Sequence, residues 1–163
     1  MTEDAAQGQR DLSALLVPLA GELLVVPSAV VVEIIRRREL ERPAQAPEWL
    51  LGMLHWHEST IPVLCFEALN GGSLSDTGHG GRIVILGVLG EHAVLRHYAI
   101  LAQGVPHLLL MTAADLQPDP ARSAGTVERM KVRVHGQDAA IPDLDAVEAA
   151  LAQLSSGGRV SRG

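Results

Sequence analysis

The chain alternates between short apolar runs and polar breaks rich in proline and glycine along almost its whole length. Many runs contain Val and Ile, whose branched side chains favour strands over helices. The runs of the first half are Leu12–Ala20, Glu22–Val26 and Val30–Ile35. Those of the second half are Arg82–Leu89, Tyr98–Ala102, His107–Met111, Arg129–His135 and Ala139–Pro142. This pattern predicts an all-β chain.

Residues 47–66 predict a β-hairpin with a polar tip. A strand-like run reaches Trp56, and the polar corner His57–Thr60 reverses the chain. Ile61–Phe66 is then the returning strand, with Pro62 near its start, where a missing N–H is tolerated. Connections displayed by a rigid scaffold carry most recognition, so we expect functional residues at this tip.

The last apolar stretch is the only one with a helical period. Asp143 is suited to cap a helix that runs to Leu154, because its side chain can accept a backbone N–H. Asp145 and Glu148 place negative charge near the N-terminal end, where the helix dipole favours it. The apolar residues at helical spacing are Leu144, Val147, Leu151 and Leu154.

Polar and glycine-rich segments bound the predicted domain. Residues 1–11 and 155–163 are expected to be flexible tails, and the Gly/Ser-rich residues 70–81 a flexible loop. The domain therefore runs from residue 12 to 154, with two intertwined β-barrel halves on either side of that loop.

The two halves resemble each other in the order of their elements. Ile61-Pro62 closes the hairpin of the first half, and Ile141-Pro142 closes that of the second. The order of strand, strand, proline-containing connection, hairpin and short helical segment occurs twice. This repeat predicts two small β-barrels, each too small to bury a core alone. Since aromatic residues make up only 2% of the chain, we expect the core to be aliphatic.

Composition and charge exclude several classes of protein. A net charge of −6 provides no basic footprint for nucleic acid, and few aromatic side chains are present to stack on bases. The lone Cys65 cannot form an internal disulfide and fits a reducing compartment. The start, Met1–Asp4, is acidic and does not fit a secretory signal, and the apolar stretch Leu23–Ile35 is interrupted and too short to span a bilayer. We therefore expect a cytoplasmic protein that reaches membranes only through a partner.

Three short motifs occur in a characteristic order. They are Val31-x-Glu33-Ile34, then Pro47-x-Trp49-Leu50-x-Gly52, then Ile61-Pro62-Val63. In this order and at these separations, the set resembles the CheW family of chemotaxis coupling proteins. The resemblance covers Leu12 to Leu154, because the order of strands and the closing helix also fit.

The resemblance implies two SH3-like five-stranded β-barrels that share an aliphatic core, followed by a C-terminal α-helix. It also implies a non-enzymatic adaptor without a cofactor. Its partners would be the signalling tip of a methyl-accepting chemoreceptor and the regulatory domain of a CheA-type histidine kinase, in arrays at the membrane. The segment Trp49–Gly52 is similar to divergent CheW-like proteins of chemosensory systems that control type IV pili and twitching motility.

The chain departs from the family pattern at the hairpin tip. His55, His57 and Glu58 stand where the family commonly has Asn, Arg and Gly, and Cys65 stands where it has Asp. The resemblance places Glu33 close to His57, so we expect these two side chains to lie within ion-pair reach and to border the partner-binding surface. The residues expected to bind partners are Glu33, Trp56, His57, Glu58, Ile61 and Pro62.

A competing interpretation is a small ligand-binding or metal-binding β-barrel. His55 and His57 lie two residues apart and would share one face of a strand, with Cys65 of the returning strand as a third ligand. A converging polar pocket would favour this interpretation, whereas exposed apolar edge strands would favour the adaptor.

Two further features have simpler structural explanations. Cys65 fits a core position better than a nucleophile, and no glycine-rich phosphate loop or catalytic triad is recognisable. The run Arg36–Arg38 is expected to be a solvated edge that discourages strand pairing, or a contact for an acidic partner.

Overall fold

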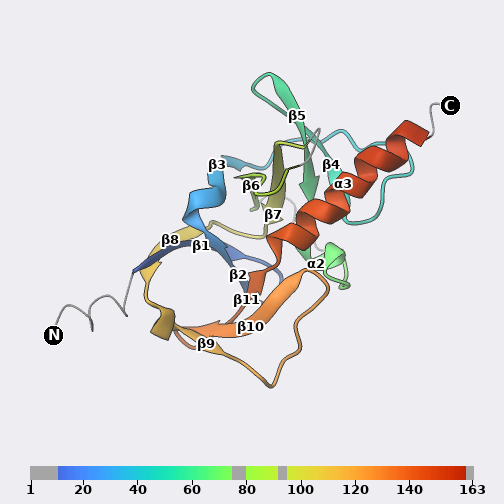
Figure 1. The fold of residues 1–163 in the computed structure, drawn as a ribbon. Coiled ribbons are helices and arrows are strands. Elements are labelled where there is room, and N and C mark those ends of the chain that lie inside the picture. Colours follow the sequence, from blue (N-terminus) through green and yellow to red (C-terminus); the bar gives the residue numbers. More distant parts are fainter. Residues whose placement is uncertain (1–10, 75–79, 92–94, 161–163) are drawn as a thin grey trace.

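The computed structural model describes residues 11–74, 80–91 and 95–160, the side chains of 155–160 excepted. The predicted N-terminal tail up to residue 10, the middle of the loop 70–81 and the last three residues lie outside these ranges. The described residues form two β-sheets and a C-terminal helix (Figure 1). The predicted all-β class with a closing helix is confirmed.

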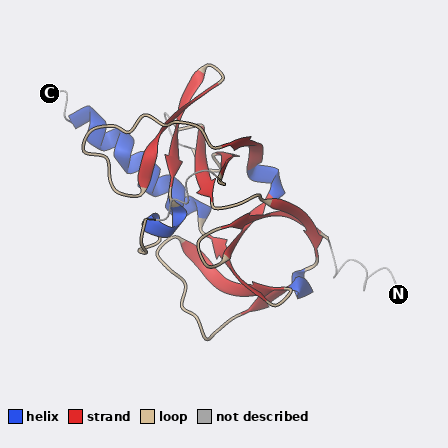
Figure 2. Cartoon of the chain, turned by 180° about the vertical axis from the view of Figure 1, so that it is seen from behind, coloured by secondary structure: helices blue, strands red, loops and turns tan. Residues whose placement is uncertain are grey.

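The first sheet has six strands in the order β8-β1-β2-β11-β10-β9. Its strands curve into a ring that is plain from behind (Figure 2). They are β1 (Leu12–Pro18), β2 (Leu23–Pro27), β8 (His107–Met111), β9 (Leu116–Pro118), β10 (Glu128–Val134) and β11 (Gln137–Pro142). The sixth strand arises because the short β9 pairs with the outer side of β10. Its three residues lie outside the apolar runs of the sequence and include Pro118.

The second sheet has the five expected strands, in the order β3-β6-β7-β5-β4. They are β3 (Val31–Arg36), β4 (Leu50–Trp56), β5 (Ser59–Leu64), β6 (Arg82–Gly87) and β7 (His97–Ala102). A backbone bridge between Glu41 and Met53 joins the segment after β3 to β4. The two sheets form two SH3-like subdomains.

The two halves of the chain exchange strands. Each sheet contains a parallel pair, β2 with β11 in the first and β5 with β7 in the second. These pairs join strands of opposite halves, so β1 and β2 complete the barrel of the second half, while β6 and β7 complete that of the first. The repeated order predicted from sequence is therefore present, but neither half forms a barrel on its own.

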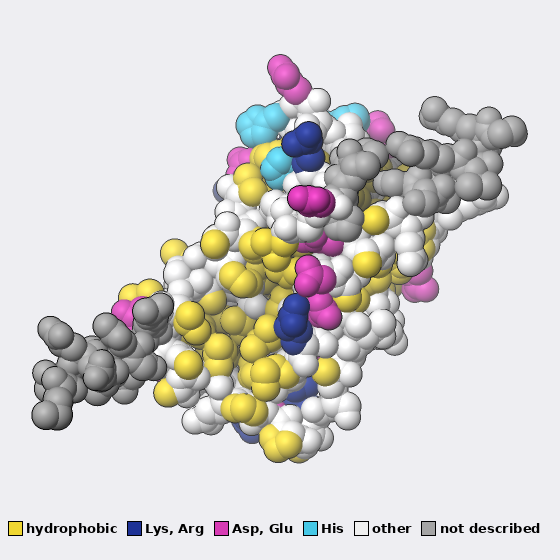
Figure 3. Space-filling model, viewed as in Figure 1, with side chains coloured by type: hydrophobic (Ala, Val, Ile, Leu, Met, Phe, Trp, Pro, Cys, Tyr) yellow, Lys and Arg dark blue, Asp and Glu magenta, His cyan; other side chains and the backbone are white. Residues whose placement is uncertain are grey.

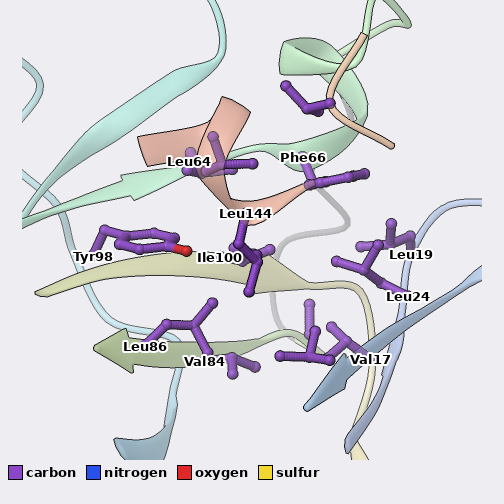
Figure 4. Close-up of a cluster of buried hydrophobic side chains, with 14 of the residues drawn as sticks. Val17, Leu19, Leu24, Leu64, Phe66, Val84, Leu86, Tyr98, Ile100 and Leu144 are labelled. Atoms are coloured by element: carbon purple, nitrogen blue, oxygen red, sulfur yellow. The ribbon is translucent and has the colours of Figure 1, made fainter. Parts of the chain in front are cut away.

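A shared core lies between the two subdomains, and α3 (Leu144–Val160) packs on it (Figure 4). Side chains from both sheets meet there, including Leu24, Val84 and Ile100, with Val147 from the helix. The expectation of a purely aliphatic core is wrong in one respect. The largest fully buried side chains are Tyr98 and the single Phe, Phe66, which fill the space between smaller neighbours.

The helix α3 begins as predicted. The Asp143 carboxylate accepts the backbone N–H of Ala146 at 3.2 Å. The helix continues to Val160, beyond its predicted end at Leu154. Extending a formed helix costs little, because each added residue brings its own hydrogen bond.

Glu148 does more than favour the helix dipole. Its side chain is fully buried, and its carboxylate accepts the backbone N–H groups of Leu89 and Gly90 at 2.8 and 2.9 Å. The helix therefore holds the loop after β6 in place. The position of Glu148 in the sequence did not predict these two hydrogen bonds, because the sequence does not show which distant loop packs against the helix.

Candidate partner-binding site

The predicted hairpin is present, with a tighter tip than expected. β4 and β5 pair in antiparallel register, with Trp56 opposite Ser59 and His55 opposite Thr60. The turn therefore consists of His57 and Glu58 alone, and the predicted four-residue corner is wrong. Ser59 and Thr60 are polar because they lie on an exposed part of a strand. His57 adopts a left-handed backbone with φ of 51°, which two-residue hairpin turns require.

Glu33 meets the hairpin tip, as expected from the sequence. The indole N–H of Trp56 donates to Glu33 Oε2 at 2.6 Å, and His57 Nε2 lies 3.6 Å from the same oxygen. The predicted ion-pair reach between Glu33 and His57 is therefore confirmed. The hydrogen bond from Trp56 was not foreseen, because the sequence does not reveal that β3, which pairs with β6, also comes close to the hairpin tip.

Local backbone geometry brings Glu33 to this place. β3 stands at one end of its sheet, and a register shift interrupts its pairing with β6 between Val31 and Glu33. Such bulges re-aim a side chain. On the other side, the ring of Trp56 contacts two imidazoles, His57 at 4.6 Å between centroids and His97 of β7 at 5.0 Å. We call Glu33, Trp56, His57 and His97 the tip cluster.

The remaining predicted site residues surround the hairpin. Glu58 is exposed at the turn, whereas Ile61 is buried and Pro62 is half-buried. Ile61 and Pro62 line a groove of about 810 Å³ between the hairpin, the connection 43–47 and α3. Figure 3 shows histidine side chains gathered at the end of the molecule where this hairpin projects.

The structure does not bring His55, His57 and Cys65 together. His55 faces Glu41 at 3.5 Å and His57 faces Glu33, so the two imidazoles have different carboxylate neighbours. Cys65 is fully buried and precedes α2 (Phe66–Leu69), because β5 ends at Leu64 and not at Phe66 as predicted. Within the described ranges, no three His, Cys, Asp or Glu side chains are grouped as a metal ligand set. The metal interpretation is wrong for these residues, and a buried thiol is closed to a substrate.

Aliphatic side chains are exposed on one of the two end strands of each sheet. On β3, Val32 and Ile34 are 48% and 40% exposed, and on β8, Leu108 and Leu110 are 68% and 66% exposed. These two strands hold equivalent positions in the exchanged topology. The sequence did not reveal this surface, because both strands are almost wholly apolar and nothing shows which face is left uncovered. Exposed apolar end strands were the feature expected of an adaptor.

A second concave site lies at the open end of the first subdomain. It has a volume of about 310 Å³, and Figure 3 shows hydrophobic side chains gathered on this face. Its lining is aliphatic except for Ser13, Arg129 and Asp145. Arg129 lies 3.4 Å from Asp145 and 3.8 Å from Asp143, so its charge is already paired. The cavity lacks the converging polar groups expected of the ligand-binding interpretation.

Comparison with known proteins decides the family. The model of the CheW-like domain matches residues 13–150, which include every candidate site residue. The chain belongs to the CheW-like domain family. No curated protein matches its sequence.

A solved CheW structure has the same fold as this CheW-like chain. It is the scaffolding protein TtCheW from Thermoanaerobacter tengcongensis, with a TM-score of 0.69 and 17% sequence identity. The match covers 83% of this chain and 86% of that one. At this identity the likeness concerns the fold alone. Within the described part of the chain, no helix is long and apolar enough to cross a membrane.

Proposed function

We propose that this CheW-like chain is a non-enzymatic adaptor of chemosensory signal transduction. It couples methyl-accepting chemoreceptors to a CheA-type histidine kinase by binding the receptor signalling tip and the kinase regulatory domain. The protein acts in the cytoplasm, at receptor arrays on the membrane. Two findings support this proposal, namely membership of the CheW-like family and a fold shared with the scaffolding protein TtCheW.

One observation carries the proposal for this chain's own residues. β3 exposes Val32 and Ile34 on either side of Glu33, whose carboxylate is engaged by the hairpin tip. Apolar side chains of a partner can be buried on this strand while polar groups fix the orientation, as in other protein interfaces. We therefore assign partner binding to Glu33, Trp56, His57, Glu58, Ile61 and Pro62, together with Val32 and Ile34.

Modest contacts are sufficient for such a role. In an array, each adaptor is held by several neighbours, and linked binding events strengthen one another without new contacts. A single weak interface can therefore transmit a signal when it is repeated many times.

A pull-down tests the proposal. We expect the wild-type chain to retain both a purified kinase regulatory domain and a receptor signalling tip. Ile34→Glu places a charge on the exposed face of β3 and should abolish retention of at least one partner. Met130→Glu is the matched control, because Met130 is an exposed apolar residue on β10, outside the proposed surface. If the wild-type chain retains neither partner, the CheW-like fold has a different role here.

We further propose that the output is control of type IV pili and twitching motility. The similarity of Trp49–Gly52 to divergent CheW-like proteins supports this. A deletion strain should lose twitching zones on agar and regain them with the wild-type gene. Unchanged twitching in the deletion strain would assign a different output.

A further inference from the structure

The tip cluster surrounds an indole ring with groups that exchange protons. The ring of Trp56 contacts the imidazoles of both His57 and His97, and its N–H donates to the Glu33 carboxylate. The side chains of His57 and Glu33 are 71% and 44% exposed, so protons and partners reach them from solvent. Histidine as a class changes charge between about pH 5 and pH 8.

We propose that the tip cluster is a proton-operated switch on the partner-binding surface. With both imidazoles neutral, the cluster carries only the negative charge of Glu33. With both protonated, two positive charges stand against one negative charge, so the sign of the cluster reverses. This inference rests on the proposed adaptor function only for its effect on partners.

Protonation also fixes the tip against β3. A charged His57 completes an ion pair with Glu33 across the two elements, over a separation of 3.6 Å. In the neutral state, the hydrogen bond from Trp56 to Glu33 still joins the hairpin to β3, but the ion pair is absent. The protonated tip is therefore better organised before a partner arrives, which favours binding.

Other charged groups near the tip do not cancel this change. Glu58 follows His57 in the turn, and Arg96 precedes His97. On β4, His55 has its own carboxylate partner, Glu41, and its backbone carbonyl accepts a hydrogen bond from Arg38. Among the described residues, the imidazole of His57 lies near the Glu33 carboxylate and contacts the ring of Trp56, which also contacts His97.

The second hairpin supplies an internal control. His135 occupies the corresponding turn between β10 and β11, has φ of 48° and lies 3.3 Å from Asp115. The backbone geometry of His135 and its carboxylate neighbour are thus similar to those of His57. Within the described residues, however, the ring of His135 contacts no aromatic side chain, whereas His57 contacts Trp56.

Tryptophan fluorescence of the full chain tests the switch without any partner. Protonated imidazole quenches indole emission, so the emission should fall as the pH is lowered from about 8 to about 5, the range in which histidine as a class gains its charge. The double variant His57→Asn, His97→Gln should remove the response; Asn tolerates the left-handed backbone at position 57. His135→Asn should keep the response, and Trp56→Phe should remove it by leaving only Trp49. A flat wild-type titration, or a response unchanged in the double variant, overturns the proposal.

Partner affinity measured at two pH values tests the effect on binding. We expect the wild-type chain to bind the kinase regulatory domain or the receptor tip about fivefold more tightly at about pH 6 than at pH 8. His57→Arg keeps its charge at both values and should reduce this ratio. Equal wild-type affinities overturn the effect on binding. Absence of binding by every variant at both values contradicts the adaptor function instead, and the fluorescence result then decides the switch alone.

Discussion

At the residue scale, single side chains join segments that are distant in the sequence. Glu33 stood out because it interrupts an apolar run, and its proximity to His57 followed from the family resemblance. The hydrogen bond between Trp56 and Glu33 could not be predicted in this way, because it depends on the bulge in β3. Glu148 illustrates the same limit, since its helical spacing does not reveal that it accepts two backbone N–H groups of a loop.

Removing the indole N–H should weaken the attachment of the tip. Trp56→Phe is expected to lower the free energy of unfolding by about 1 kcal/mol, because one hydrogen bond to a charged acceptor is lost. Chemical denaturation measures this. In the Trp56→Phe background, Glu33→Gln should have less effect than in the wild type. Additive losses from the two substitutions would show that the hydrogen bond contributes nothing.

Replacing Glu148 should be far more costly than replacing an exposed acid on the same helix. Glu148→Ala leaves the N–H groups of Leu89 and Gly90 without their acceptor and should cost about 2–4 kcal/mol of unfolding free energy. Asp145→Ala is the matched control, because Asp145 is exposed and should change stability by about 0.5 kcal/mol or less. Thermal melts that fail to separate the two variants would contradict this role of Glu148.

At the element scale, the apolar pattern located strands better than it located their ends. The hairpin of residues 47–66 was predicted, but Ser59 and Thr60 were assigned to the turn because exposed strand positions and turns are both polar. The second hairpin shows the same error. The predicted runs ended at His135 and resumed at Ala139, whereas the turn is His135–Gly136 and β11 already begins at Gln137.

The structure gives a physical reason for Gly52, the glycine of the motif Pro47-x-Trp49-Leu50-x-Gly52. A Cβ at this position would lie 2.7 Å from the Cβ of Leu40 and 3.1 Å from the carbonyl oxygen of Glu41. The absent side chain lets the segment after β3 pair with β4 at Met53. Gly52→Ala should therefore cost about 1–3 kcal/mol by overpacking. Gly21→Ala is a control for backbone strain, because that glycine has φ of 92° but open space around it. If denaturation shows equal losses of unfolding free energy for the two variants, the close approach of Leu40 and Glu41 is not the reason for a glycine at position 52.

At the scale of the whole molecule, strand exchange decides which residues meet. The sequence revealed the repeated order of elements, but order alone does not reveal which strands pair. The parallel pairs β2–β11 and β5–β7 form between opposite halves, and the shared core forms where these barrels meet. An ion network also ties distant segments together. Lys131 contacts Glu22 and Glu128, and Arg122 contacts Glu22 and Asp119.

This ion network makes the stability of the fold depend on pH. The hydrogen bond from Arg122 is the main cause that holds the pKa of Asp119 below its usual value. Because the folded-state pKa is the lower one, the stabilisation is present above the ordinary carboxyl pKa, about 4, and is lost as the pH falls through the folded value. Melting temperatures should therefore fall in acid. Asp119→Asn should flatten that fall, whereas Glu48→Gln, an exposed control, should leave it unchanged. Identical pH profiles for wild type and Asp119→Asn would contradict this role.

Receptor control of kinase activity tests the adaptor function most directly. Autophosphorylation of the CheA-type kinase is measured with receptor present, with and without the chain, and with the Ile34→Glu variant. We expect receptor-dependent kinase activity only when the wild-type chain is added, with Met130→Glu equivalent to wild type and Ile34→Glu inactive. Kinase activity that responds to receptor equally well without the chain would contradict the account.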